Sequence, residues 1–303
     1  MALLIPDNII MVTNIMSKYV NSLVKNVNSE NLPKDIDLIF DGGALNCLSG
    51  QGVALYIKEL ENQELVRIHR VSGCSSGAFI ALLYLTNTDY DLNEGFNMVS
   101  NCFREKQNLT EFIDQVKKYI YNNLPDDLSF LNDKLYITYY DMSEWKQKIV
   151  CVFENKDKLI ETIVRSCYIP YIFDKHLKYK EKYIDGITPY IFRDNKREAI
   201  FVMLVTKKNF SKCISTKNES NSYSRLLSGA ADADLFFSSG SSDMCSYVSK
   251  WNIYFILILR LRELVFFIIV WIIELITKFS EYIPNQILNS TLYHGCCRFI
   301  SNI

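Results

Sequence analysis

The sequence predicts an α/β protein, because segments with the apolar period of strands alternate with segments that have the period of helices. Two predicted strands end at glycine-containing turns, Asp41-Gly42-Gly43 and Gly73-Cys74-Ser75-Ser76-Gly77, and a predicted helix follows each turn. The 303 residues are enough for one large domain with appendages or for two modest domains.

The composition excludes several classes of protein. Hydrophobic residues make up 49% and charged residues 22% of the chain, which argues against disorder and against a protein built wholly of membrane spans. A formal net charge of −1 supplies no field that collects nucleic acid, so no nucleic-acid partner is expected. The nine cysteines form no metal-ligand spacing and the first residues lack a signal-peptide pattern. We therefore expect no metal or other cofactor, and an intracellular setting with free thiols.

The predicted elements follow from hydrophobic periodicity. Residues 9–27 read as an amphipathic helix that packs on the core, and residues 78–85 are apolar on every side, which is typical of a buried helix. The other predicted helices lie near residues 53–60, in residues 92–123 (two helices) and at 157–167. The predicted strands are residues 36–40, 65–71, 135–140, 148–153 and 199–205.

The same reading divides the chain into four segments, with a boundary in the Lys-, Asn- and Ser-rich stretch 207–224. The expected segments are an N-terminal amphipathic helix (1–35), a catalytic α/β domain (36–205), a polar loop and helical connector (206–250), and an apolar helical segment with a tail (251–303).

Ser75 is the candidate nucleophile. It lies in a G-x-S-x-G pattern between a predicted strand and a predicted buried helix, where Gly73 and Gly77 permit the tight turn that exposes the hydroxyl. The dipole of the following helix favours negative charge at this place. Without that context, a serine flanked by glycines is more often a helix cap.

The glycine turn after the first strand can supply backbone N–H groups for an oxyanion. Gly42, Gly43 and Ala44 are the candidate donors, and a β-α-β unit places this turn beside Ser75 at the carboxyl edge of a parallel sheet. A phosphate-binding loop requires a Gly-Lys-Ser/Thr sequence, which does not follow here.

A base completes the requirements of acyl transfer. Asp185, with Gly186 in an apolar stretch, is one candidate, because burial would favour uptake of a proton. The alternative is an Asp-Gly turn without a chemical role. The three histidines, His69, His176 and His294, each have an ordinary structural explanation, but His294 would complete a Ser75-Asp185-His294 triad in an α/β-hydrolase.

In their order and spacing, Asp41-Gly42-Gly43, Gly73-Cys74-Ser75-Ser76-Gly77 and Asp185-Gly186 resemble the motifs of the patatin-like phospholipase family. The segment Ser166-Cys167-Tyr168-Ile169-Pro170-Tyr171-Ile172-Phe173 is similar to the Ser-x-x-Ile-Pro-x-x-Phe stretch that precedes the catalytic Asp of that family. The resemblance implies a three-layer α/β/α core with a central, mostly parallel sheet. It also implies a Ser-Asp dyad without histidine, formed by Ser75 and Asp185, that hydrolyses acyl esters of membrane lipids.

Three features depart from the family pattern. The family turn usually reads Asp-Gly-Gly-Gly-x-Arg/Lys-Gly, whereas the last residues here include Ala44, Asn46 and Cys47, so the basic residue is missing. A backbone donor at Ala44 survives the change from glycine unless the position needs a positive φ. Ile187 stands where Gly or Ala usually follows Asp-Gly. These departures keep open a catalytically silent lipid-binding protein of the same fold.

The C-terminal apolar segment is the candidate membrane contact. Residues 251–277 contain four charged residues and no uncharged run longer than ten, which is short of the roughly 20 that a simple span needs. In a helical projection Arg260, Glu263 and Glu274 share one stripe and Arg262 lies off it. This pattern favours an interfacial helix on a membrane surface over residues 251–282, and a core helix or a tilted span are the alternatives.

The lysines between residues 175 and 182 either meet anionic headgroups or form a solvated hairpin. The sequence as a whole predicts a membrane-associated lipid acyl hydrolase that acts on a phospholipid or another acyl lipid.

Overall fold

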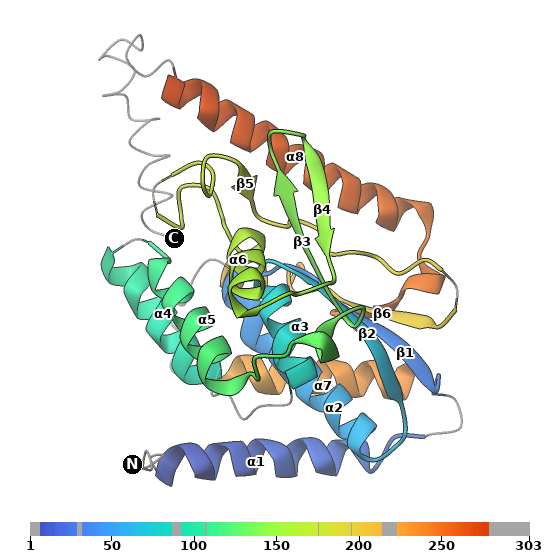
Figure 1. The fold of residues 1–303 in the computed structure, drawn as a ribbon. Coiled ribbons are helices and arrows are strands. Elements are labelled where there is room, and N and C mark those ends of the chain that lie inside the picture. Colours follow the sequence, from blue (N-terminus) through green and yellow to red (C-terminus); the bar gives the residue numbers. More distant parts are fainter. Residues whose placement is uncertain are drawn as a thin grey trace.

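The computed structural model describes residues 7–28, 32–86, 92–106, 108–174, 176–194, 196–213 and 223–278. Within these ranges a mixed sheet lies between helices on both faces, which confirms the predicted three-layer α/β/α class. Figure 1 shows α8 along one side of the sheet and α2, α3 and α7 on the other.

Four parallel strands form the centre of the seven-stranded sheet in the described ranges, in the order β3-β2-β1-β6. Their bounds are Asp35–Phe40 (β1), Arg67–Cys74 (β2), Leu135–Asp141 (β3) and Glu198–Val202 (β6). Three antiparallel strands complete it: Lys146–Val150 (β4) and Tyr183–Ile184 (β5) on β3, and Cys245–Tyr247 (β7) on β6. Because Phe40 pairs with Gly73, the turns after β1 and β2 are neighbours at the carboxyl edge, as predicted.

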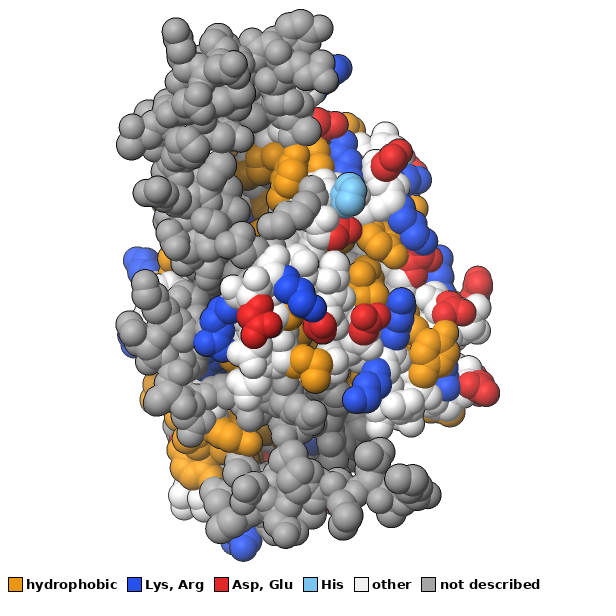
Figure 2. Space-filling view, turned by 90° about the vertical axis from the view of Figure 1, so that its left-hand side faces the viewer, with side chains coloured by type: hydrophobic (Ala, Val, Ile, Leu, Met, Phe, Trp, Pro, Cys, Tyr) orange, Lys and Arg blue, Asp and Glu red, His pale blue; other side chains and the backbone are white. Residues whose placement is uncertain are grey.

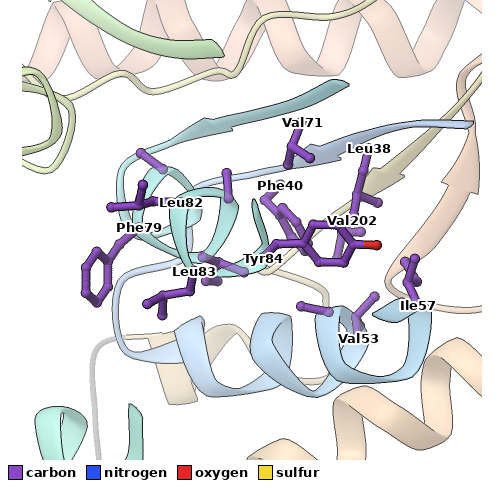
Figure 3. Packing of buried hydrophobic residues seen from close by; sticks show 14 of the residues in the cluster. Leu38, Phe40, Val53, Ile57, Val71, Phe79, Leu82, Leu83, Tyr84 and Val202 are labelled. Atoms are coloured by element: carbon purple, nitrogen blue, oxygen red, sulfur yellow. The ribbon is translucent and has the colours of Figure 1, made fainter. Parts of the chain in front are cut away.

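The first face of the sheet is covered by helices from both halves of the chain. α3 (Ser76–Thr86) is buried over most of its length and lies between the sheet and α2 (Cys47–Asn62), as Figure 3 shows for Leu82, Tyr84 and Val53. α1 (Asp7–Val24) packs on α2 and α7 through Met16, Val20 and Val24. The remaining helices on this side are Leu92–Lys106 (α4), Thr110–Asn123 (α5) and Lys156–Ser166 (α6).

α7 (Tyr223–Ser239) and α2 meet backbone to backbone at two glycines. A Cβ atom on Gly52 would lie 2.0 Å from the Leu226 carbonyl oxygen, and one on Gly229 would lie 1.9 Å from the Ser49 carbonyl oxygen. A side chain at either position would force the two helices apart. Residues 206–250, predicted as a polar loop and helical connector, thus include a helix tightly packed on α2 and a strand of the central sheet.

The second face of the sheet is covered by α8 (Ile253–Lys278). Leu259 of α8 is buried against Ile39 and Phe201 of the sheet, and Val270 is buried against a second cluster near the end of β3. Within the described ranges, no helix combines the length and the low charge that a membrane span needs.

The strand predicted at residues 148–153 is shifted in the structure. Its ladder with β3 runs from the pair Asp141 and Lys146 to the pair Ile137 and Val150. Beyond Val150 the backbone turns to other partners, and the Phe153 N–H donates to Asn132 Oδ1 at 2.8 Å. The apolar run 151–153 is therefore not part of the strand, because a side chain outside the sheet takes its backbone donor.

Candidate active site

Ser75 lies in a strained turn between β2 and α3, with a φ of 51°. A left-handed conformation is uncommon for residues other than glycine and is frequent at functional sites. A Cβ on Gly73 would lie 2.3 Å from the Gly77 carbonyl oxygen, and one on Gly77 would lie 2.4 Å from that of Asp41. Both glycines are therefore needed for the strand and helix to cross this closely.

The backbone of Ser75 is fixed on both sides. Its N–H donates to Ser166 Oγ at 2.9 Å, and its carbonyl oxygen accepts from the Ala78 N–H at 2.9 Å and from the Cys167 thiol at 3.0 Å. The residue is 6% exposed. Ser166 and Cys167 belong to the segment that resembled the stretch before the family's catalytic Asp, so this segment supports Ser75 directly.

Asp185 follows β5 and lies at the same edge of the sheet. A Cβ on the next residue, Gly186, would lie 2.3 Å from the Thr138 carbonyl oxygen and 2.8 Å from Cys74 Cβ. Only glycine lets this segment lie so close to the ends of β2 and β3. The Asp185 and Gly186 N–H groups donate to the carbonyl oxygens of Tyr168 (2.9 Å) and Ser166 (3.0 Å).

The carboxyl of Asp185 is buried and incompletely paired. Oδ1 accepts from the Ile187 N–H at 2.9 Å, whereas Oδ2 makes no hydrogen bond of normal geometry to the part of the chain that the structure describes. Burial raises the pKa of Asp185 to about 6, while the Ile187 N–H, the Ser75 hydroxyl and the charge of Arg262 act to lower it and Asp41 to raise it further. A carboxyl with a pKa near neutrality, within reach of a serine hydroxyl, is suited to proton transfer.

The glycine turn lies directly beside Ser75, since a Cβ on Gly42 would come within 3.0 Å of Ser75 Cβ. The Gly42 N–H donates to Asp41 Oδ1 at 2.9 Å and the Gly43 N–H donates to Ser76 Oγ at 3.1 Å. Two of the three predicted oxyanion donors therefore bind protein acceptors in this structure. Ala44 begins the 3₁₀ turn Ala44–Asn46, where N–H groups have no intrahelical partner.

Two of the residues that depart from the family motifs have left-handed backbones. Ala44 has a φ of 44° and Ile187 a φ of 54°. This conformation costs an L-residue roughly 1–2 kcal/mol, and it is a clear outlier for β-branched isoleucine. Ile187 is held there by burial, because it packs in one cluster with Ile184, Tyr140 and Val270 of α8.

Two arginines at the glycine turn were not identified as site residues from the sequence. Arg262 of α8 donates from Nη1 to Asp41 Oδ2 (2.5 Å) and from Nη2 to Asp41 Oδ1 (2.9 Å), and Asp41 is completely buried. Arg225 of α7 is also buried and donates to the Leu45 carbonyl oxygen (2.6 Å) and to Asn46 Oδ1 (3.1 Å). Two observations in the sequence could have pointed to them: Arg262 lies off the polar stripe of its helix, and Asn46 stands where the family motif has a basic residue.

A cavity of about 140 Å³ opens beside Ser75. Its wall is formed mainly by apolar side chains of α3, α4, α5 and the segment after α6, and it also reaches Ala44 of the glycine turn. Prominent members are Phe79, Phe96, Phe112, Ile169 and Phe173. This wall suits a hydrocarbon chain and offers little to a polar ligand.

The described histidines lie away from Ser75 in the hydrogen-bond network. His69 contacts Asp35 at 2.6 Å at the amino end of the sheet, opposite to the edge that carries Ser75, and exposed His176 contacts Asp174. His294, the third member of the alternative triad, lies outside the described residues.

The cysteines around the site are free thiols in the described part of the chain. Burial raises the pKa of Cys74 and of Cys167 well above the usual value, which keeps both thiols protonated and poorly nucleophilic. The described residues contain no group of three or more His, Cys, Asp or Glu side chains that could hold a metal ion.

Part of the chain is similar to known proteins. A family model described as "Patatin-like phospholipase" matches residues 38–195, a range that contains both Ser75 and Asp185. Omega-hydroxyceramide transacylase of Mus musculus is 26% identical over 156 residues, which are 48% of this chain and 26% of that protein. The Homo sapiens protein of the same name is 25% identical over 138 residues, 43% of this chain and 26% of that protein. The chain thus spans about a quarter of the length of these curated relatives.

The strain at Ala44 yields a stability prediction. Replacing Ala44 with glycine should raise the free energy of unfolding by about 1 kcal/mol, because glycine adopts a positive φ without steric cost. Chemical denaturation checks this value. The matched control is Ala231→Gly on the exposed side of α7, where the same change in a helix should lower it by roughly 0.5–1 kcal/mol. Equal losses in both variants would contradict the prediction.

Proposed function

Because the chain belongs to the patatin-like phospholipase family, we propose that it hydrolyses fatty-acyl esters of lipids, with Ser75 as nucleophile and Asp185 as base. The observation that carries the proposal is the buried Asp185 carboxyl, which interacts with the hydroxyl of Ser75 at the edge of an apolar cavity. Burial raises the pKa of this carboxyl to about 6, and the Ser75 hydroxyl acts to lower it. The family model is described as a phospholipase, and the matched relatives are named transacylases. Ser75 and Asp185 supply the nucleophile and the base that both kinds of reaction need.

In the first half-reaction, the Asp185 carboxylate takes the proton of the Ser75 hydroxyl while the serine oxygen attacks the ester carbonyl carbon. The tetrahedral intermediate collapses when the bond to the alcohol oxygen breaks and the proton passes from Asp185 to that oxygen. The acyl group is then an ester of Ser75. In the second half-reaction, Asp185 takes a proton from water, whose oxygen attacks the acyl carbon, and Ser75 recovers its proton as the fatty acid leaves.

Stabilisation of the oxyanion is assigned to the glycine turn and to α3. The Gly43 N–H would exchange Ser76 Oγ for the oxyanion. Ala44, whose N–H is assigned as a second donor, lines the same cavity as Ser75, and α3 begins at Ser76 with the positive end of its dipole. The Gly42 N–H is the least available of the three, because its acceptor is the carboxylate of the adjacent Asp41.

The acyl chain of the substrate is proposed to occupy the cavity lined by Phe79, Phe96 and Phe112. Acyl transfer to an alcohol is a second candidate reaction, because the two relatives are named transacylases. Both reactions share the acyl-Ser75 intermediate, and they differ only in whether water or a hydroxyl group of a second molecule releases the acyl group.

The outer face of α8 is proposed to lie on a lipid surface. Eleven apolar side chains on this face are between 43% and 71% exposed. They follow the helix at three- and four-residue steps: Ile253, Tyr254, Leu257, Ile258, Leu261, Leu264, Val265, Ile268, Ile269, Trp271 and Ile272. A continuous apolar face of this length is typical of helices that lie at the membrane interface.

Charge attraction contributes less to this proposed contact than the burial of apolar side chains does. Three of the four lysines considered for headgroup binding are paired: Lys178 with Glu274 (2.8 Å), Lys180 with Glu161 (2.6 Å) and Lys182 with Asp141 (3.0 Å). Lys175 lies outside the described residues. Figure 2, which views the left-hand side of Figure 1, shows acidic and basic side chains interspersed over the described part of that face. The proposed lipid contact therefore depends on apolar burial.

The first prediction from the proposed function concerns the nucleophile. Ser75→Ala should abolish labelling by a fluorophosphonate and reduce release of fatty acid from phospholipid vesicles by at least a thousandfold, because the covalent route is lost. Ser72→Ala is the matched control: Ser72 lies on β2, which ends just before Ser75, and its buried hydroxyl has no hydrogen-bond partner in the described ranges. Labelling that persists in Ser75→Ala would refute the assignment. Ester formation with an added long-chain alcohol would identify the transfer reaction.

The second prediction concerns Asp185 and pH. The pKa is raised from the usual value of 3.8 to about 6, so folding favours the protonated form. Activity should rise as the pH increases through about 6, because the base must be ionised. Below pH 3.8 the Asp185 carboxyl is neutral in both the folded and the unfolded state, so its burial does not lower the free energy of unfolding. Above pH 6 the carboxyl is ionised in both states, and its burial lowers the free energy of unfolding by up to about 3 kcal/mol.

Asp185→Asn should therefore remove activity while raising the free energy of unfolding at pH 7. This gain should vanish below about pH 4, because the native carboxyl is then neutral in both states. Urea denaturation at both pH values checks the stability, and fatty-acid release checks the activity. A variant that is less stable than the native chain at pH 7 would contradict the prediction.

The third prediction concerns the lipid contact. The double variant Leu261→Glu/Ile268→Glu changes two side chains that are 58% and 45% exposed, so the fold should persist. Its cosedimentation with phosphatidylcholine vesicles should weaken by about tenfold or more, because charges replace apolar groups at the interface. Leu235→Glu, on α7 at a side chain that is 52% exposed, is the control and should sediment like the native chain. Equal sedimentation of all three proteins would exclude α8 as the contact.

A further inference from the structure

Two adjacent charged residues of α8, Arg262 and Glu263, contact two loops of the proposed site, the glycine turn (residues 41–47) and the Asp185 segment (residues 185–190). The Arg262 guanidinium makes two hydrogen bonds to the carboxylate of Asp41, and Asp41 Oδ1 also accepts the Gly42 N–H. Glu263 Oε1 accepts from the Thr188 hydroxyl and from the Tyr140 hydroxyl, the latter at 3.1 Å. Thr188 lies three residues beyond Asp185, so one turn of α8 is bound to the segments on both sides of Ser75.

Most of the groups in these contacts are shielded from water, although the Arg262 side chain itself is 33% exposed. Asp41 is 0%, Thr188 5% and Glu263 8% exposed. The Thr188 carbonyl oxygen also accepts from Thr138 Oγ1 and from Gln147 Nε2, both at 2.7 Å, which ties the loop to β3 and β4. A buried carboxylate that loses its cationic partner is strongly destabilised, so the Asp41 carboxylate needs Arg262 where it lies.

Attachment of the helix does not by itself require these charges. Leu259 and Val270 already bury α8 against the sheet, and Glu274 anchors it through Lys178, away from Asp41 and Thr188. A buried ion pair adds little net stability compared with an apolar pair of similar size. What Arg262 and Glu263 add is geometric: two directed contacts to loops whose backbones are strained at Ala44 and Ile187.

We propose that Arg262 and Glu263 are positioning residues of the site: Arg262 fixes the glycine turn through Asp41, Glu263 fixes the Asp185 segment through Thr188, and the docking of α8 thereby sets the geometry of both. This inference rests on the proposed function of Ser75 and Asp185. The glycine turn itself contains no basic residue. Positive charge beside it comes instead from Arg262 of α8 and Arg225 of α7, and both helices lie outside the range that matches the family model.

The electrostatic consequence separates positioning from simple support of the fold. The groups that face Asp185 are the Ser75 hydroxyl, Arg262, Asp41 and the thiols of Cys74 and Cys167. The charge of Arg262 lowers the pKa of Asp185 and that of Asp41 raises it, while both thiols stay neutral. Loss of Arg262 alone should move the acid limb of the activity profile to higher pH, and loss of both charges should return it towards the native profile.

The kinetic test uses the full chain and a water-soluble short-chain ester. Arg262→Gln should lower kcat at least tenfold, change KM less than twofold and shift the acid limb upward. The double variant Asp41→Asn/Arg262→Met should restore the acid limb while kcat stays low, because the directed contact is still absent. Glu274→Gln, which breaks an ion pair of α8 away from both loops, should keep the native kcat and pH profile. A native kcat and pH profile in Arg262→Gln would overturn the proposal.

Hydrogen exchange tests the same contacts without using activity. Arg262→Gln should raise deuterium uptake at least threefold in residues 41–47, and Glu263→Leu should do so in residues 185–190. Glu263→Gln, which retains an oxygen acceptor for Thr188 and Tyr140, should behave like the native chain. If Glu263→Leu does not fold, Thr188→Val removes only the hydroxyl and should raise uptake in the same segment. Unchanged uptake in both segments would overturn the proposal.

The two proposals fail in distinguishable ways. If the native chain shows no hydrolysis that depends on Ser75, the proposed function fails, and the exchange experiment still decides whether α8 positions the loops. If hydrolysis depends on Ser75 but neither kinetics nor exchange responds to Arg262→Gln and Glu263→Leu, the positioning role fails alone.

Discussion

The close approach of three backbone segments at the carboxyl edge of the sheet is the constraint on which the site depends. The turn after β1, the turn after β2 and the segment after β5 meet there, and a Cβ atom at any of four contact positions would lie 3.0 Å or less from a neighbouring atom. These contact positions are Gly42, Gly73, Gly77 and Gly186. Ser75 and Asp185 become neighbours because the segments that carry them approach backbone to backbone at these glycines. The placement of the two polar groups is thus a consequence of packing.

The same edge of the sheet carries several features that oppose folding. Ser75, Ala44 and Ile187 have left-handed backbones, and Asp185 has a carboxyl whose ionisation is disfavoured by burial. Such features persist only where contacts with the surrounding structure stabilise them by more than the strain costs. Here the fixing comes from hydrogen bonds of Ser166 and Cys167 to the Ser75 backbone and from the packing of α8 on Ile187. Strained residues and an unpaired carboxyl oxygen therefore lie where the proposed chemistry takes place.

Much of the fold was predictable because strands and helices of the first half follow their own periodicity. β1, α2, β2 and α3 lie within a few residues of the predicted ranges, and the neighbouring positions of the two turns followed from a β-α-β unit. The contact of Arg262 with Asp41 was not predictable, because the two residues are 221 positions apart and periodicity does not define where a helix docks. The sequence showed Arg262 off the polar stripe. Only the docked helix shows that this direction leads to the glycine turn.

α8 has two faces with different surroundings, and binding at one face is thermodynamically linked to binding at the other. Its inner face binds the glycine turn and the segment that carries Asp185, while its outer face exposes apolar side chains along most of the helix. Any surface that binds the outer face only when α8 is docked stabilises the docked state by mass action. Because Asp41 and Thr188 are bound only in that state, the same surface also stabilises the arrangement of both loops, and the coupling is reciprocal. If the outer face rests on a lipid surface, as proposed, contact with the substrate phase would favour the ordered site without any change in its chemistry.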